Sequence, residues 1–224
     1  MKNVSTQPLR LLPNRVSYLI PGGAMIDSFL GLKPGSCPGA SQMWIASVVQ
    51  SALSNAPDTR SYLYPEDDGG CLAEHLQNYP EEMLGKVHAD RFGATPGFLM
   101  KLLHSDQRLL VQVHPDKEKS KRYFNLPFGK TETWYVLDTT PGETTYVWVG
   151  FRPETTPEKF RSLIQQQDYP SILQCLHRFE ITAGDVIFIP AGLPHAMGSG
   201  SLVAEIQEPT DLTLWAECFG FDGS

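Results

Sequence analysis

Two strand-like runs, residues 109–114 and 132–137, most constrain what this chain can fold into. Side chains alternate between the two faces of a strand, so Gln112 and His114 lie on one face of the first run. The second run opens with Glu132, after an intervening stretch that is long enough to let the two runs become neighbours in a sheet. We therefore expect the Glu132 carboxylate to lie beside the His114 imidazole.

A third run carries a further candidate ligand. A Gly-Asp turn leads into the apolar run 185–190, and the prolines and glycine that follow bend the chain and hold His195 at a rigid corner. A single histidine on a strand is more often a hydrogen-bonded core residue than a metal ligand. The joint presence of His114, Glu132 and His195 in one strand-rich half nevertheless favours a metal site, with Gln112 as an unusual amide ligand. Such a nitrogen and oxygen site suits Zn²⁺ or another divalent first-row metal and leaves a position for water or substrate.

The pattern of the whole chain predicts an all-β barrel or sandwich. The first hundred residues are rich in Gly and Pro and are expected to form turns and short strands, with the clearest strand at 43–49 and helical spacing at 72–79. One helix should begin at Thr156 and Pro157, and a second short helix should cover 172–176. The other predicted strands are 98–103, 109–114, 132–137, 145–149, 185–190, 201–207 and 211–219.

Composition excludes several classes of protein. The formal net charge of −7 argues against a nucleic-acid partner, and the basic residues at 117–122 are interleaved with Glu118 and Ser120, as in a solvated helical turn or loop. A role of this cluster in steering anions is the alternative. No apolar run is long enough to cross a bilayer, and the amino terminus lacks the apolar segment of a signal peptide, so we expect a cytoplasmic protein. The four widely spaced cysteines are expected to be reduced thiols.

Three runs resemble the metal-binding signature of type I mannose-6-phosphate isomerases, a family of zinc-dependent cupins: VQVHPDKE, GKTETWYVLD and AGDVIFIPAGLPHAMGSG. The resemblance is clearest from about residue 84 to 211. It implies an all-β cupin, a jelly-roll β-barrel with a few short helices, in a short form with a single domain over 1–224. Residues 1–95 would supply N-terminal strands, turns and a short helix, and residues 96–224 the metal-binding barrel core. It also implies one Zn²⁺ per chain, and the family's four ligands fall on Gln112, His114, Glu132 and His195.

The resemblance extends in part to the substrate side. Lys101 and Lys130 fall at the family's active-site lysines, whereas Trp215 and Leu110 stand where the family has an arginine and a serine. Glu205 matches a family acid, and Gln207 lies two residues further along the same strand face. The implied catalytic residues are Glu205, Asp211 and Lys130, and the implied substrate-binding residues are Lys101, Lys130, Gln207 and Trp215.

The function implied is a zinc-dependent isomerase that interconverts mannose 6-phosphate and fructose 6-phosphate. Because Trp215 and Leu110 remove donors that a phosphate needs, a sugar-binding metal cupin without catalysis is an alternative. A different isomerisation or an iron-dependent reaction on the same scaffold is a third. The expected partner is a sugar or sugar phosphate, and a homodimer through edge strands is possible.

Overall fold

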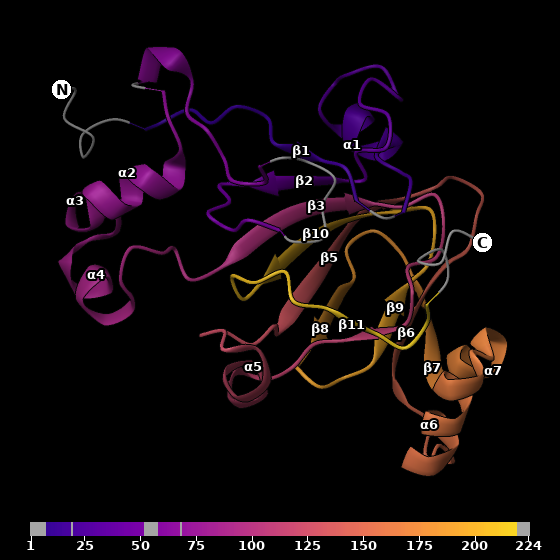
Figure 1. Cartoon of the computed structure of the whole chain (residues 1–224). Helices are drawn as coiled ribbons and strands as arrows, with labels where there is room; N and C mark the ends of the chain where they lie inside the picture. Colours follow the sequence, from indigo (N-terminus) through magenta and orange to yellow (C-terminus); the bar gives the residue numbers. More distant parts are fainter. Residues whose placement is uncertain (1–7, 19, 52–57, 68, 219–224) are drawn as a thin grey trace.

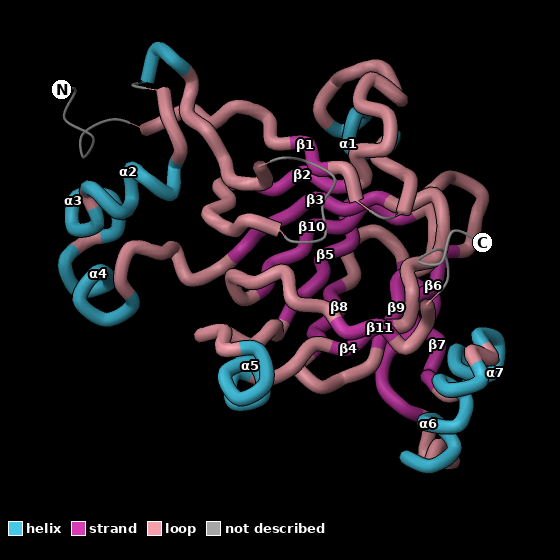
Figure 2. Tube along the Cα trace, in the orientation of Figure 1, coloured by secondary structure: helices cyan, strands magenta, loops and turns pink. Residues whose placement is uncertain are grey.

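Two antiparallel sheets form the centre of the structure, and helices lie around them (Figures 1 and 2). The computed structural model describes residues 8–18, 20–51, 58–67 and 69–218. The first sheet has the strand order β1 (Arg15–Val16), β2 (Gln42–Ile45), β3 (Leu99–His104), β10 (Ser201–Gln207), β5 (Glu132–Thr139) and β8 (Val186–Ile189). The second sheet has the order β11 (Leu214–Trp215), β4 (Gln112–Val113), β9 (His195–Met197), β6 (Thr145–Phe151) and β7 (Leu176–Ile181).

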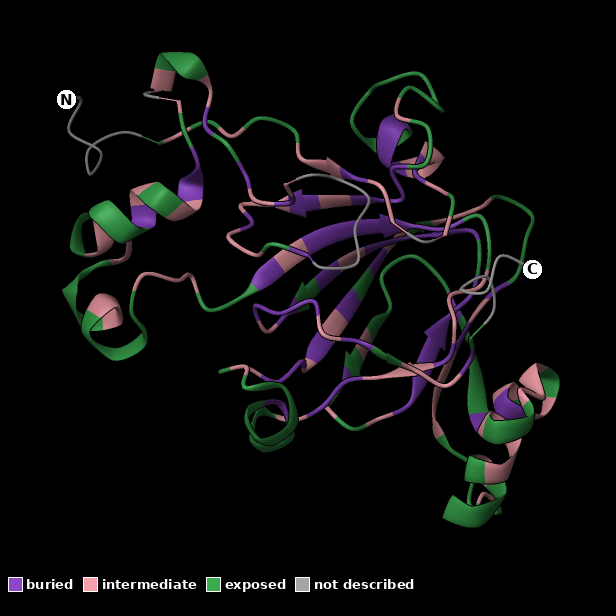
Figure 3. Cartoon of the chain, in the orientation of Figure 1, coloured by how far each residue is buried: buried purple, intermediate pink, exposed green. Residues whose placement is uncertain are grey.

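The main core contains side chains from both sheets. Trp134 of β5 and Val203 of β10 belong to the same buried cluster as Val147 of β6 and Met197 of β9, and each of these side chains is at most 1% exposed. Figure 3 shows buried residues concentrated in the central strands, whereas the outlying helices are largely exposed. Every second side chain in 132–137 and 201–207 is buried, and these buried faces carry polar residues such as Glu132 and Glu205 beside the apolar ones.

Five predicted strands are confirmed, and three are shorter than expected. The strands predicted at 98–103, 132–137, 145–149, 185–190 and 201–207 correspond to β3, β5, β6, β8 and β10. The run 43–49 ends as β2 at Ile45, because Ala46 has a φ of 51°. Of 109–114 only Gln112–Val113 is strand, since Val111 N donates to the Glu217 side chain instead of to a neighbouring strand. Of 211–219 only Leu214–Trp215 pairs.

The amino-terminal third confirms the helix predicted at 72–79 but otherwise differs most from the prediction, because it contains further helices where turns and short strands were expected. Pro80, which interrupts the pattern at 72–79, occupies the first position of a new helix, where its missing N–H costs nothing. Gly85 and Gly93 flank the last helix of the group. The helices of this third are α1 (Ala24–Phe29), η1 (Pro65–Asp67), α2 (Leu72–Asn78), α3 (Pro80–Leu84) and α4 (Lys86–Phe92).

The remaining helices agree better with the sequence. α5 (Lys117–Phe124) carries the basic cluster, and its basic side chains are exposed, as predicted for a solvated helical turn. α6 (Pro157–Gln166) is capped by Thr156, whose side chain accepts from Lys159 N at 3.2 Å, as predicted. The second helix is α7 (Tyr169–Gln174), slightly earlier than 172–176. No helix among the described residues is long and apolar enough to span a membrane, and all four cysteines are free thiols.

Gly198 allows β9 and β6 to approach closely. Its N donates to Tyr146 O at 2.8 Å, and a Cβ at this position would lie only 2.5 Å from the same oxygen. We expect Gly198→Ala to displace β9 and to lower the free energy of unfolding by about 1–3 kcal/mol, the usual cost of overpacking. Urea denaturation measures this change. A loss below about 0.5 kcal/mol would contradict the close approach.

Candidate metal centre and adjoining pocket

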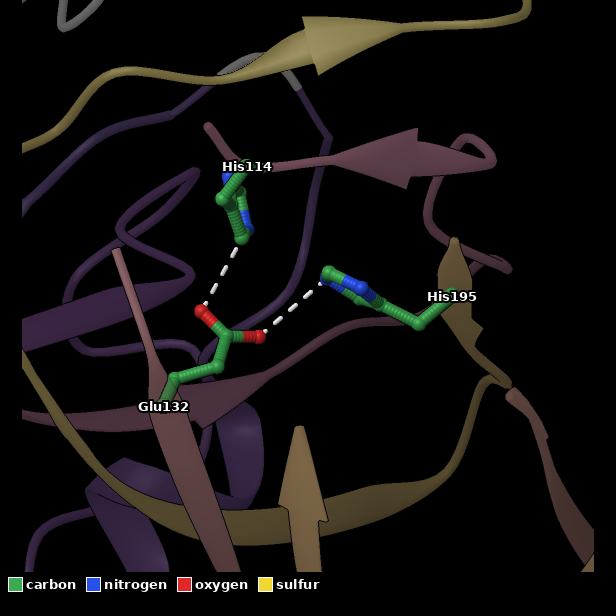
Figure 4. Close-up of side chains that lie close together, drawn as sticks. All are labelled: His114, Glu132 and His195. Atoms are coloured by element: carbon green, nitrogen blue, oxygen red, sulfur yellow. Dashed lines mark ion pairs between the residues drawn. The ribbon is translucent and has the colours of Figure 1, made fainter. Parts of the chain in front are cut away.

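Three buried ligand groups meet between the two sheets (Figure 4). His114 directly follows β4, Glu132 is the first residue of β5 and His195 is the first residue of β9. His114 Nε2 lies 3.3 Å from Glu132 Oε2, and His195 Nε2 lies 3.2 Å from Glu132 Oε1. One donor atom from each residue lies within 4.8 Å of the other two. The structure therefore brings together three of the four predicted ligands.

Backbone carbonyls fix how the two imidazoles are oriented. His114 Nδ1 lies 3.1 Å from Leu212 O, and His195 Nδ1 lies 2.8 Å from Leu193 O. Because a carbonyl can only accept, each Nδ1 carries the proton, and each Nε2 presents its lone pair toward Glu132. Metal-ligating histidines usually have this arrangement, in which the nitrogen that does not bind the metal donates to a second group.

The ligand atoms are buried without hydrogen-bond partners. His114, Glu132 and His195 are at most 1% exposed. Within the described part of the chain, neither Nε2 atom and neither Glu132 oxygen has a hydrogen-bond partner. Buried polar atoms without partners are costly, and a divalent cation shared by two imidazoles and a carboxylate would satisfy all of them. These residues therefore fit a metal ion.

Gln112, the fourth predicted ligand, lies beside this group. It pairs directly with His195 across β4 and β9, and residues that are directly opposite in an antiparallel pair have side chains on the same face. Gln112 also lines the adjoining pocket. The amide is thus adjacent to the His-Glu-His group, at the boundary between that group and the pocket.

Burial and neighbouring charges keep His114 and Glu132 in the protonation states that a metal needs. Burial lowers the pKa of His114 to about 3, and the Lys130 ammonium contributes to the same shift. Burial alone would raise the pKa of Glu132, but Lys130 and the two histidines outweigh it and hold that pKa well below its usual value. At neutral pH the site therefore offers a neutral imidazole and a carboxylate.

The lowered pKa of His114 predicts that the metal-free protein loses stability in acid. In the unfolded chain His114 has a pKa of about 6.5, so between pH 6.5 and 3 the unfolded state holds a proton that the folded state lacks. The free energy of unfolding should fall as pH decreases through this range, by up to about 1.4 kcal/mol per pH unit. Urea denaturation of chelator-treated protein from pH 7.5 to 4.5 measures the slope. His114→Gln should reduce the slope, whereas His177→Gln, at an exposed position, should retain it; equal slopes in all three proteins would contradict the assignment.

A pocket of about 530 Å³, including space open to solvent, adjoins the ligand group. Lys130 connects the two, since it lines the pocket and its Nζ lies 3.5 Å from Glu132 Oε2. Gln207 was predicted to bind substrate but lies outside the lining residues; it is 2% exposed, and its Nε2 donates to the Glu208 and Thr210 carbonyls. The predicted residues that line the pocket are Lys101, Leu110, Gln112, Lys130, Glu205, Asp211 and Trp215.

Lys101 and Glu205 form the buried polar wall of the pocket. Lys101 Nζ lies 3.2 Å from Glu205 Oε1 and 3.7 Å from Asp211 Oδ1, and 4.8 Å from the centre of the Trp44 ring. Burial lowers the pKa of Lys101, but the surrounding carboxylates outweigh it and raise that pKa, so the lysine stays charged. Trp134 Nε1 donates to Glu205 Oε2 at 3.0 Å. Glu205 therefore has one oxygen held by the indole and the other directed toward the lysine.

Three polar pocket residues were missed by the sequence analysis: Tyr18, Gln42 and Thr213. The Tyr18 hydroxyl lies 3.3 Å from Asp211 Oδ2, to which Ser51 also donates, and burial raises the pKa of Tyr18. Gln42 Oε1 accepts from Trp44 Nε1 at 2.6 Å. Gln42 lies two residues before Trp44 on a strand and so could have been assigned to the same face. Tyr18 lies outside any helix or strand, and no local pattern indicates its position.

Known proteins resemble the chain in both sequence and fold. A family model described as "Phosphomannose isomerase type I, catalytic domain" matches residues 55–157. The probable mannose-6-phosphate isomerase GmuF of Bacillus subtilis is 35% identical over 136 residues, which are 59% of this chain and 41% of that protein. Mannose-6-phosphate isomerase ManA of the same organism is 32% identical over 144 residues, covering 64% of this chain and 42% of ManA.

A solved structure agrees with these matches. The crystal structure of mannose 6-phosphate isomerase from Bacillus subtilis is 25% identical with a TM-score of 0.75, over 96% of this chain and 62% of that one. This chain thus spans about two fifths of the first two curated relatives and about three fifths of the solved structure. The chain is therefore a relative of the type I phosphomannose isomerases, and its similarity includes their catalytic domain.

Proposed function

We propose that this chain is a zinc-dependent aldose–ketose isomerase of the mannose-6-phosphate type, acting on mannose 6-phosphate and fructose 6-phosphate. The observation that carries the proposal is the buried His-Glu-His group, whose facing ligand atoms lack partners among the described residues, beside a pocket lined by two lysines and two acids. One Zn²⁺ would be held by Gln112, His114, Glu132 and His195. We also propose that the two sheets close as a cupin jelly-roll barrel, and that 1–95 and 96–224 belong to one domain.

The reaction moves one proton between C1 and C2 of the open-chain sugar and another between their oxygens, so nothing is gained or lost overall. A bound Zn²⁺ would polarise the carbonyl and the neighbouring hydroxyl as a Lewis acid. Lys130 would donate a hydrogen bond to the oxygen on which negative charge develops. Glu205 would carry the proton between the carbons, because it lines the pocket and Trp134 orients one of its oxygens, while the other lies 3.2 Å from Lys101 Nζ.

Asp211 is assigned a different role from Glu205. Its carboxylate accepts from the Tyr18 and Ser51 hydroxyls and lies 3.7 Å from Lys101 Nζ. The two hydroxyl donors hold this carboxylate in place, so a positioning role fits it better than proton transfer. Asp211 would instead keep Lys101 charged and orient the sugar hydroxyls.

Purified zinc-loaded protein tests the proposal. Conversion of mannose 6-phosphate to fructose 6-phosphate should exceed that of a Glu132→Ala control, and the absence of any difference would refute the activity. Glu205→Gln should lower kcat by about 10²- to 10⁴-fold, the usual contribution of general acid–base catalysis. Asp211→Asn should mainly raise KM. A large loss of kcat in Asp211→Asn with mainly a raised KM in Glu205→Gln would instead make Asp211 the proton carrier.

A sugar-binding metal cupin without catalysis is the second candidate. It is favoured by Leu110 and Trp215, which line the pocket at positions where the resemblance places a serine and an arginine. Binding of sugars, seen as a rise in melting temperature, without conversion would support this candidate. Metal analysis of the purified protein would separate zinc from iron. A homodimer and a cytoplasmic location remain predictions.

A further inference from the structure

The cations in and next to the pocket already face carboxylates. Lys101 Nζ lies 3.2 Å from Glu205 Oε1, and Lys130 Nζ lies 3.5 Å from Glu132 Oε2. Among the described residues, no other lysine or arginine lines the pocket. Both lysines are at most 4% exposed, so these pairs are shielded from competing water. A substrate anion would have to compete with a buried carboxylate for either ammonium group.

Arg108 directly precedes the lining residue Leu109 in the sequence but does not itself line the pocket. Its Nη1 and Nη2 bind the two Glu217 oxygens at 2.8 and 2.9 Å, and Glu217 is fully buried. Both terminal nitrogens of the guanidinium are thus bound to one carboxylate. Turning the guanidinium toward a ligand would leave the buried Glu217 charge without its partner. Arg108 is therefore not available to a phosphate either.

A second part of the pocket lining, beside Gln112, is apolar. Leu110 lies two residues before the ligand Gln112, and Trp215 pairs directly with Gln112 across β11 and β4. Ile20, Leu103 and Leu109 complete the apolar lining. A phosphate monoester carries about −1.5 to −2 charges at neutral pH, and placing it against such a wall costs its hydration without providing charged donors.

The same pocket suits an uncharged polyhydroxy compound. The Gln42 side-chain oxygen is occupied by Trp44 Nε1, and its amide nitrogen makes no hydrogen bond to a described residue, so it can donate to a hydroxyl of the ligand. The Tyr18 and Thr213 hydroxyls also line the pocket. The Trp215 indole offers a flat apolar surface of the kind on which the C–H face of a sugar packs.

We propose that this site accepts unphosphorylated aldoses as substrates, and that a phosphate on the sugar adds little to their recognition. This inference depends on the proposed isomerase function, because it names the substrate class of the same pocket. It follows from the pairing of Lys101, Lys130 and Arg108 with carboxylates and from the apolar wall at Leu110 and Trp215.

The experiment compares kcat/KM of the zinc-loaded chain for mannose and for mannose 6-phosphate. We expect the two values to lie within tenfold of each other, and a larger preference for the phosphosugar would overturn the inference. Leu110→Lys, which adds a cation to the apolar part of the lining, should raise the ratio in favour of mannose 6-phosphate at least tenfold. Val87→Lys adds the same charge at a position that is 83% exposed on α4 and should leave the ratio unchanged. An unchanged ratio in correctly folded Leu110→Lys would also count against the inference.

A binding measurement distinguishes failure of the proposed isomerase function from failure of this inference. If neither sugar is converted, the proposed reaction fails, and isothermal titration calorimetry with the same two sugars decides the inference. Dissociation constants within tenfold of each other support it. Mannose 6-phosphate binding more than tenfold tighter, or no binding of mannose, overturns it. Inorganic phosphate is the third probe, and strong competition by phosphate against mannose would also contradict it.

Discussion

Glu132→Gln is expected to remove the metal ion and to lower kcat/KM by about 1,000-fold or more. The substitution keeps the shape of the side chain but takes away the anionic group shared by His114 and His195. Loss of the ion would remove several kcal/mol of stabilisation from the transition state, and each 1.4 kcal/mol corresponds to a factor of ten. Elemental analysis of the purified variant and an isomerase assay measure the two effects.

The same variant separates loss of the ion from loss of the fold. Zinc at about 100 to 1,000 times its dissociation constant should stabilise the wild-type protein by about 3–4 kcal/mol, and a chelator should abolish this gain. Glu132→Gln should show no zinc-dependent change in melting temperature. Glu158→Gln removes a carboxylate from an exposed position on α6 and should behave as wild type. Full zinc content in Glu132→Gln would refute the assignment of the centre.

Arg108→Met is expected to lower the free energy of unfolding by about 3–5 kcal/mol, because it leaves a buried carboxylate without its partner. Glu217 is fully buried, and it accepts from Val111 N at 2.7 Å in addition to both terminal nitrogens of Arg108. The Arg108 side chain is 28% exposed, so entry of water should place the loss toward the lower end of the range. Urea denaturation at fixed zinc concentration measures it.

An exposed ion pair provides the matched control for this prediction. Lys86 Nζ lies 3.1 Å from Asp90 Oδ2 on α4, and the two side chains are 68% and 60% exposed. Lys86→Met should cost less than about 1 kcal/mol, as exposed pairs usually do. The double variant Arg108→Met with Glu217→Met should be more stable than Arg108→Met alone. If Arg108→Met costs no more than Lys86→Met, the buried pair is not the source of stability.

The sequence predicted those parts of the fold that depend on alternation within one strand. The two-residue period of β5 and β10 determines which side chains share a face, and the register then brings Glu205 opposite both Lys101 and Trp134. Glu132 could be identified from the sequence as a candidate metal ligand because it begins one of these strands. Such residues are recognisable because a single local period determines both their secondary structure and the direction of their side chains.

The remainder depends on contacts that no local pattern encodes. The strand predicted at 109–114 is shortened by a carboxylate that is distant in sequence, Glu217, which takes the N–H of Val111. The edge strand β7 was missed because four successive residues, 177–180, are all exposed and show no alternation. Tyr18 enters the pocket from an irregular segment, through its contact with Asp211. Propensity and periodicity do not carry this information, since each of these features is fixed by tertiary structure.

The candidate ligand group lies between the two sheets, since Glu132 begins a strand of one sheet and His195 begins a strand of the other. An ion at this point would cross-link the two sheets, whereas the backbone hydrogen bonds connect only strands within one sheet. Removing the ion should therefore allow the two sheets to separate locally, while the hydrogen bonds within each sheet are retained. Amide hydrogens at the beginning of β5 and of β9 would then exchange with deuterated solvent faster and in concert.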